Sequence, residues 1–218
     1  MNIAARLTSA AVASLALAMP ASAQLTFTGY TNACFYTGVV ACTPENTNIG
    51  TTDVSGPLVY RNSTFSVTTA GGSAQIGNSP ATPNVNNLGS FTLPNDVSVT
   101  NFANQSFLLN VFFTAPASVL PTNTTFMALL SGTVDGNTGG VTINFDNNPK
   151  MFTYAGGTFT LEVADVFLTN TVLGTTVAVT GNLVASPSTT VPEPSTYILM
   201  ASGLAGLGVV ARRRRNNA

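Results

Sequence analysis

Apolar and polar side chains alternate with a period of two through much of the chain between residues 24 and 187. A period of two places every second side chain on one face of a strand, whereas a helix needs a period near 3.6. Threonine supplies much of the polar half of the pattern. The alternation is clearest in segments 25–28, 64–68, 107–113, 159–163 and 177–179. The pattern predicts half-buried β-strands.

Clusters of Gly, Pro and Asn separate these segments, notably at 71–72, 78–87, 135–140 and 155–157. We expect about ten to twelve short strands at regular spacing, with no amphipathic helix among them and one long loop over 71–87. This arrangement predicts an all-β domain at 24–187, an antiparallel two-sheet sandwich that is jelly-roll-like or Ig-like. A parallel β-helix is the alternative fold, and the lack of a fixed repeat period disfavours it.

Charged residues make up only 7% of the 218-residue chain, while 44% of its residues are hydrophobic, so the composition is not that of a disordered chain. Residues 24–187 contain two basic side chains, Arg61 and Lys150, and seven acidic ones, which gives a net charge of −5. Such a domain lacks the basic surface that phosphate backbones require, and we expect no nucleic-acid partner.

Cys34 and Cys42 are the only cysteines. In an exported protein, an even pair at this spacing predicts a disulfide bond, since a metal site would need further Cys or His ligands. Two free thiols are the alternative.

The first 23 residues have the three parts of a secretory signal peptide. A start containing Arg6 precedes an apolar stretch over 7–19, and small residues follow at Ala21 and Ala23. This order predicts export with cleavage before Gln24.

The C-terminal segment 188–218 also has three parts in a fixed order. A linker and a proline-rich motif occupy 188–196, an uncharged apolar run follows at 197–211, and a basic cluster occupies 212–215. The motif is Val191, Pro192, Glu193, Pro194 and Ser195, and the cluster is Arg212, Arg213, Arg214 and Arg215. Prolines on both sides of a carboxylate predict an extended motif. We expect 197–211 to form a single transmembrane helix, with the arginines setting the topology from the cytoplasmic side.

This order of Val-Pro-Glu-Pro-Ser, short Gly-rich apolar run and terminal Arg cluster resembles the PEP-CTERM sorting signal. The resemblance implies that an exosortase-type processing enzyme reads Pro192, Glu193 and Pro194 in a bacterium that secretes exopolysaccharide. A permanent single-span anchor in the inner membrane is the alternative. Segments 88–94 and 157–163 resemble the uncharacterised β domains that PEP-CTERM proteins often carry, which implies a fold but no activity.

The chain contains no histidine, which excludes Ser-His-Asp and Cys-His catalysis. Paired carboxylates remain, and Glu162 with Asp165 is the nearest pair. Their positions in the alternation point them to different faces, so we expect no catalytic site, no cofactor and no enzymatic activity.

The segment 135–146 partly follows the spacing of an EF-hand calcium loop. Asp135, Asn137 and Asp146 stand at positions 1, 3 and 12, which makes them a weak calcium candidate. Position 5 is a glycine and position 12 is not glutamate, so we expect a hairpin loop and no metal.

These features predict an exported structural or adhesive protein, held first at the inner membrane and then placed on the cell surface or in an exopolysaccharide matrix. A carbohydrate-binding or carbohydrate-active protein is the alternative. Aromatic side chains that can stack on sugar rings would favour that alternative, and the candidates are Tyr30, Tyr36, Tyr60 and Tyr154.

Overall fold

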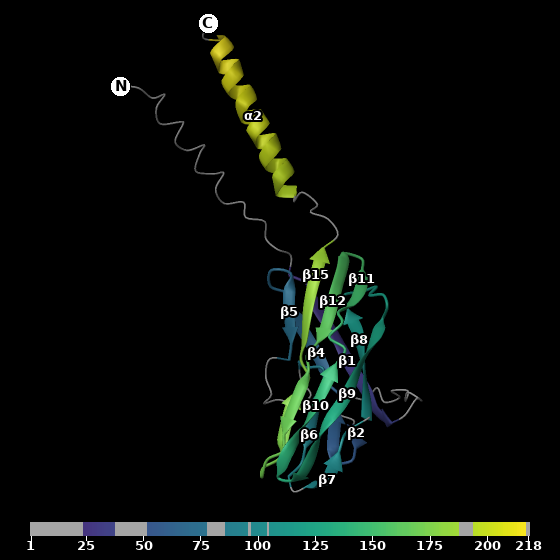
Figure 1. The fold of residues 1–218 in the computed structure, drawn as a ribbon. Coiled ribbons are helices and arrows are strands. Elements are labelled where there is room, and N and C mark those ends of the chain that lie inside the picture. The colour runs from purple at the N-terminus through teal and green to yellow at the C-terminus, as the bar shows by residue number, and fades with distance from the viewer. Residues whose placement is uncertain are drawn as a thin grey trace, which may run out of the picture.

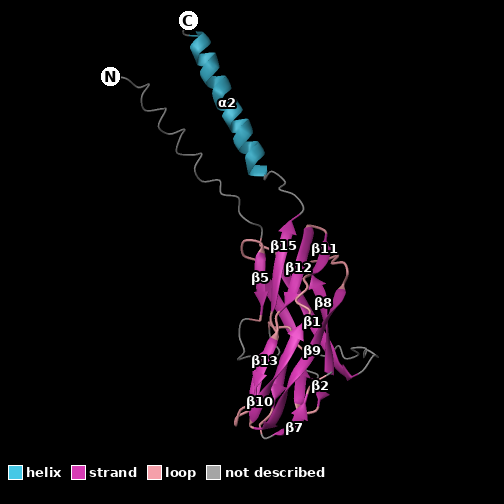
Figure 2. Cartoon of the chain, in the orientation of Figure 1, coloured by secondary structure: helices cyan, strands magenta, loops and turns pink. Residues whose placement is uncertain are grey.

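The computed structural model of the chain describes residues 24–37, 52–77, 86–95, 97–103, 105–187 and 194–216. Within these ranges the regular structure consists of fifteen β-strands and one C-terminal helix (Figure 2). All strand pairs are antiparallel. The prediction of an all-β antiparallel domain is therefore confirmed, and the alternative of a parallel β-helix is wrong.

One layer of the sandwich is a seven-stranded sheet with the order β13-β10-β9-β8-β1-β4, in which β7 also pairs with β9. Its strands are β1 (Thr26–Thr37), β4 (Thr64–Thr68), β7 (Val97–Asn101), β8 (Gln105–Ala115), β9 (Asn123–Gly136), β10 (Thr138–Phe145) and β13 (Val166–Thr169). Strands β1, β8 and β9 are long enough to run along most of the domain (Figure 1).

The other layer consists of two four-stranded sheets instead of the single sheet that a two-sheet sandwich requires. The first has the order β11-β12-β15-β5 and contains β5 (Ser73–Ile76), β11 (Lys150–Tyr154), β12 (Gly157–Val163) and β15 (Gly181–Pro187). The second has the order β14-β6-β3-β2 and contains β2 (Thr52–Ser55), β3 (Leu58–Arg61), β6 (Ser90–Leu93) and β14 (Thr175–Ala178).

Glycines interrupt the second layer where its two sheets meet. Gly77 and Gly89 have φ angles of 78° and 110°, which are incompatible with a continuous strand. A Cβ atom on Gly77 would lie 3.1 Å from the carbonyl oxygen of Val179, the residue that follows β14. The backbone therefore bends at this level, and β5 and β6 join different sheets.

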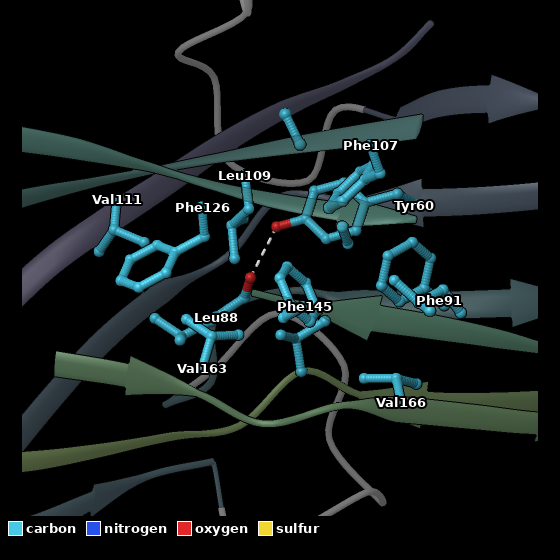
Figure 3. Packing of buried hydrophobic residues seen from close by; sticks show 14 of the residues in the cluster. Tyr60, Leu88, Phe91, Phe107, Leu109, Val111, Phe126, Phe145, Val163 and Val166 are labelled. Atoms are coloured by element: carbon cyan, nitrogen blue, oxygen red, sulfur yellow. Dashed lines mark hydrogen bonds between the residues drawn. The ribbon is translucent and has the colours of Figure 1, made fainter. Parts of the chain in front are cut away.

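Phenylalanine side chains fill the space between the layers. At one end, Phe27 packs against Phe159 and Phe113 packs against Phe152, with ring centroids 4.7 and 4.8 Å apart. At the other end, Phe107 lies 4.9 Å from both Phe91 and Tyr60 (Figure 3). These rings belong to one continuous cluster. Burying each such side chain contributes about 1.5–3 kcal/mol, so the cluster is the main source of stability.

The period-two segments of the sequence lie in β1, β4, β8, β12 and β14, as predicted, except that Leu25 precedes β1 and Val179 follows β14. The expected long loop over 71–87 is wrong in its first part, because β5 occupies 73–76. This strand buries only Ile76 fully and is held as an edge strand beside β15. A strand with a single buried anchor produces little alternation in the sequence.

Strand β1 begins and β15 ends at the same end of the sandwich (Figure 1). The backbone N–H of Thr69 donates to the carbonyl of Leu25 over 2.9 Å, and that of Ala185 donates to the carbonyl of Gly72 over 2.7 Å. Pro187, the last residue of β15, pairs with Gly157. We call this end the tail-side pole, and it consists of the connections at 69–72, 115–122 and 155–156.

Candidate functional site

The C-terminal tail forms one helix, α2 (Pro194–Asn216). It includes Pro194 and Ser195, so the prediction of an extended motif is wrong for these two residues. Proline is favoured at the first helical position because its fixed φ suits the first turn and its missing N–H would have no partner there. Val191, Pro192 and Glu193 lie outside the described residues.

The helix also continues through the basic cluster instead of ending at residue 211. Arg213, Arg214 and Arg215 form its last turn. Arginine has high helix propensity, and positive charge stabilises the C-terminal end of the helix dipole. The apolar run alone predicts a helix that ends at residue 211, because it does not include this favourable contribution of the arginines.

Leu199, Met200, Leu204 and Leu207 are exposed along α2, with exposed fractions between 56% and 69%. The predicted transmembrane helix over 197–211 is not supported, since none of the described helical segments combines the length and the apolar character that a membrane span needs. The uncharged run has fifteen residues, and the arginines follow it directly.

The predicted signal peptide lies outside the described residues, and its cleavage site is described only at the exposed Gln24. Cys34 lies on β1 and is disulfide-bonded. Cys42 also lies outside the described residues. The predicted pairing of Cys34 with Cys42 therefore stays a prediction.

The structure separates the residues of the calcium candidate. Asp135 pairs with Thr138 across the tight turn between β9 and β10, whereas Asp146 follows the far end of β10. The eight residues of β10 put about 25 Å between these ends. The expected hairpin is confirmed, and its turn is shorter than the predicted loop. Asp135, Asn137 and Asp146 are not brought together, and within the described ranges no three His, Cys, Asp or Glu side chains are grouped as metal ligands would be.

Asp146 instead forms an ion pair with Lys150, whose Nζ lies 2.8 Å from an Asp146 carboxylate oxygen. The same Nζ lies 5.8 Å above the ring of Phe126. Both charged side chains are partly exposed, at 27% and 34%. The pair therefore closes the connection between β10 and β11 and stabilises it only modestly.

Glu162 and Asp165 have separate structural environments. Glu162 lies within β12 and pairs with Asn182, whereas Asp165 lies in the short connection between β12 and β13. The Asp165 carboxylate accepts hydrogen bonds from the backbone N–H of Phe145 and, over 3.4 Å, from the side-chain amide of Asn147. Asp165 thus stabilises the end of β10, which is a structural role.

The tyrosines that were considered as sugar-stacking residues differ in how far they are buried. Tyr60 is fully buried, and Tyr154 packs against Phe27 and Phe159. Tyr30 is half-buried and stacks on Phe112 of the neighbouring strand, with centroids 4.7 Å apart and an interplanar angle of 6°. This pair lies on the outer face of the large sheet, since Phe27 and Phe113 point into the core.

Tyr60 makes a buried polar contact that the sequence did not predict. Its hydroxyl donates to the carbonyl oxygen of Leu88 over 2.6 Å (Figure 3). It also lies 3.1 Å from the Thr31 hydroxyl. Burial raises the pKa of Tyr60, and the Thr31 hydrogen bond opposes part of that shift. Nothing in the sequence identifies Leu88 as its partner, because the two residues are 28 positions apart.

Asp53 is a second carboxylate with a structural contact. One of its oxygens accepts a hydrogen bond of 2.5 Å from the backbone N–H of Phe35, and the other accepts one from Val54. Asp53 thereby joins β2 of the second layer to β1 of the first. Asp53 therefore stabilises the junction of β1 and β2, whereas Asp146 and Asp165 both stabilise the end of β10 and the connection that follows it.

Comparison with known proteins finds a similarity for the C-terminal tail alone. No curated protein and no solved structure matches this chain. The PEP-CTERM protein-sorting motif matches residues 190–215, which include the end of the linker, the Val-Pro-Glu-Pro-Ser motif and most of α2. The motif implies an exported protein that an exosortase processes. The chain thus carries a PEP-CTERM sorting tail behind an antiparallel β-sandwich.

Proposed function

We propose that this chain is an exported structural or adhesive protein, which is sorted through its tail to the cell surface or to an exopolysaccharide matrix. The observation that carries the sorting is the motif at residues 190–215. Association of the tail with the inner membrane during processing is part of the proposal. The exposed leucines and the basic last turn of α2 support it, because apolar and cationic side chains together bind anionic lipid surfaces.

The outer surfaces of the sheets support a structural role. Threonine hydroxyls hydrogen-bond across neighbouring strands over 2.9 Å in three places: Thr26 with Thr68, Thr28 with Thr114, and Thr92 with Thr176. Cross-strand pairs of this kind stabilise a sheet, and they give its surface a regular polar cover. Such a surface suits a protein that packs with other matrix components.

The distribution of the carboxylates supports a role other than catalysis. A glycoside hydrolase needs two carboxyl groups at a fixed separation on either side of one bond. In the described part of the chain, each of Asp53, Asp146 and Asp165 is held by a hydrogen-bond or ion-pair partner in the fold, and Glu162 lies within β12. Each of the three aspartates therefore has a role in stabilising the fold.

A second candidate function is carbohydrate binding, and the stacked Tyr30 and Phe112 favour it. Next to them, the Thr125 hydroxyl donates to the side-chain oxygen of Asn110 over 3.1 Å. Sugar-binding sites combine aromatic rings, which stack on the sugar, with amide and hydroxyl groups, which hydrogen-bond to it. Binding to the host's exopolysaccharide, lost in Tyr30→Ala and Phe112→Ala but kept in Phe167→Ala, would establish this function. Phe167 is the control because it is an exposed aromatic residue, at 61%, on another strand of the same sheet.

The sorting proposal is tested in a host that has an exosortase. The sandwich is detected with an antibody raised against residues 24–187, an epitope is placed at the C-terminus, and both are followed by fractionation. We expect the wild type to lose the C-terminal epitope and to reach the surface. Glu193→Ala should keep the sandwich and the C-terminal epitope together, whereas Glu162→Ala, a matched change within the sandwich, should behave like the wild type. Equal processing of Glu193→Ala and the wild type would refute the proposal.

A further inference from the structure

The sorting motif is tethered closely to the folded domain. Strand β15 ends at Pro187 and α2 begins at Pro194, so only six residues lie between them. Even a fully extended chain of this length spans at most about 25 Å. A folded unit of 100 residues has a radius of gyration near 13 Å, so an enzyme that holds the motif is wider than this distance allows. It must meet the end of the sandwich.

That end is the tail-side pole, which lies directly around Pro187. Gly157 is the residue paired with Pro187, and the carbonyl of Gly72 accepts the hydrogen bond from Ala185, two residues earlier. The connection at 115–122 is joined to the same region, since Leu120 and Thr153 exchange backbone hydrogen bonds of 2.8 Å in both directions. Neighbouring strands are about 4.8 Å apart, so these connections lie within a few strand spacings of the tether.

The chemistry of the pole differs from that of the remaining domain surface. Its three connections, 69–72, 115–122 and 155–156, contain no charged residue and consist mainly of Gly, Ala, Pro, Ser and Thr. Leu120 is 63% exposed there. The described charged residues of the sandwich lie elsewhere, as with Asp135 at the turn between β9 and β10 and Asp146 beside Lys150. The pole is therefore a neutral surface of small side chains with one exposed leucine.

We propose that the tail-side pole is a contact surface for the exosortase-type enzyme that processes the tail. The matching surface of the enzyme is uncharged, and it faces the small side chains of the pole while the motif occupies the cleft. This inference rests on the proposed sorting function and adds a requirement to it. The enzyme reads the sandwich end as well as the motif, so processing depends on the shape and charge of residues that are distant from the motif in sequence.

Ala155 is the best position for a test, because it is exposed at the turn between β11 and β12. Ala155→Lys and Ala155→Glu each place an unpaired charge on the pole. We expect both to slow processing roughly tenfold, since a desolvated charge without a partner weakens a contact by at least that factor. Leu173→Lys is the matched control, because Leu173 is 95% exposed in the β13–β14 connection, away from the pole. It should be processed at the wild-type rate.

A flexible spacer distinguishes the loss of the enzyme contact from misfolding of the sandwich. Inserting about ten Gly and Ser residues after Ser188 extends the tether beyond the width of the contact. The spacer should restore processing of Ala155→Lys, and the melting temperature of each variant confirms that the sandwich is folded. Wild-type rates for both Ala155 variants would overturn the inference, as would opposite effects of Lys and Glu, which indicate a long-range charge effect. Failure of the proposed function is distinguishable from these outcomes, because Glu193→Ala would then be processed like the wild type.

Discussion

Replacing Tyr60 by phenylalanine removes one buried oxygen atom and leaves the aromatic packing intact. The ring keeps its contacts with Phe91 and Phe107, whose centroids lie 5.1 and 4.9 Å away. The lost hydroxyl is the one that donates to Leu88 over 2.6 Å and contacts Thr31. Tyr60→Phe therefore measures the contribution of a single polar contact within an apolar core.

The expected loss follows from what happens to the two partners. Thr31 retains the backbone of Ser63, whose N–H lies 3.1 Å from the threonine hydroxyl. The carbonyl of Leu88 loses its donor inside a fully buried site. A buried acceptor without a partner costs about 1–3 kcal/mol, so we expect the free energy of unfolding to fall by about 2 kcal/mol. For a domain of this size, that corresponds to a decrease in melting temperature of about 4–8 °C.

The measurement is urea and thermal unfolding of the isolated mature domain, compared with Tyr30→Phe as the control. Tyr30 also stacks on a phenylalanine but is only half-buried, so this variant should stay within about 0.5 kcal/mol of the wild type. A Tyr60→Phe domain as stable as Tyr30→Phe would show that the hydroxyl contributes nothing. The reasoning from burial and hydrogen bonding would then be wrong.

Because burial raises the pKa of Tyr60 above its ordinary value near 10, the unfolded chain loses this proton first as the pH rises. Below pH 10 the ionisation of Tyr60 does not lower the free energy of unfolding. Above pH 10 it should lower that free energy by up to about 1.4 kcal/mol per pH unit, and Tyr60→Phe should abolish this part of the pH dependence of unfolding. Gly89→Ala should destabilise the domain by about 3 kcal/mol or more, since its φ is 110° and a Cβ atom would collide with the Tyr60 hydroxyl. Gly71→Ala, at a φ of 62° with open space around it, should cost only about 1–2 kcal/mol in the same unfolding assay. Mass spectrometry of the unreduced mature protein should find Cys34 bonded to Cys42, and full alkylation of both thiols without reductant would contradict that pairing.

The strands with strong alternation were predictable from the sequence because each buries several side chains on one face. Strand β8 is an example, since Phe107, Leu109, Val111 and Phe113 all point into the core. Strand β5 was missed because it has one buried anchor and depends on pairing with β15. The division of the second layer was also unpredictable, since it depends on where Gly77 approaches Val179 in space.

The tail was predictable to a different degree from the sites within the sandwich. A contiguous motif carries its own signal, and residues 190–215 were identified without any knowledge of the fold. The limits of α2 were less certain, since Pro194 is compatible with both an extended segment and a first helical turn. Contacts such as Asp53 with Phe35 and Asp165 with Phe145 join residues 18 and 20 positions apart. Their existence depends on strand register, which alternation alone does not specify.

The positions of the first and last strands have a mechanical consequence. Strand β15 is flanked by β12 and β5, and β1 is flanked by β8 and, near its start, by β4, so neither terminal strand is at a sheet edge. A pulling force transmitted through Pro187 along β15 acts on the seven register pairs with β12 and the four with β5 together. Interstrand hydrogen bonds lie perpendicular to the strands, so such a force shears them all at once instead of opening them one at a time. A domain held by its C-terminal end is thereby built to resist tension between its attachment point and whatever binds its far end.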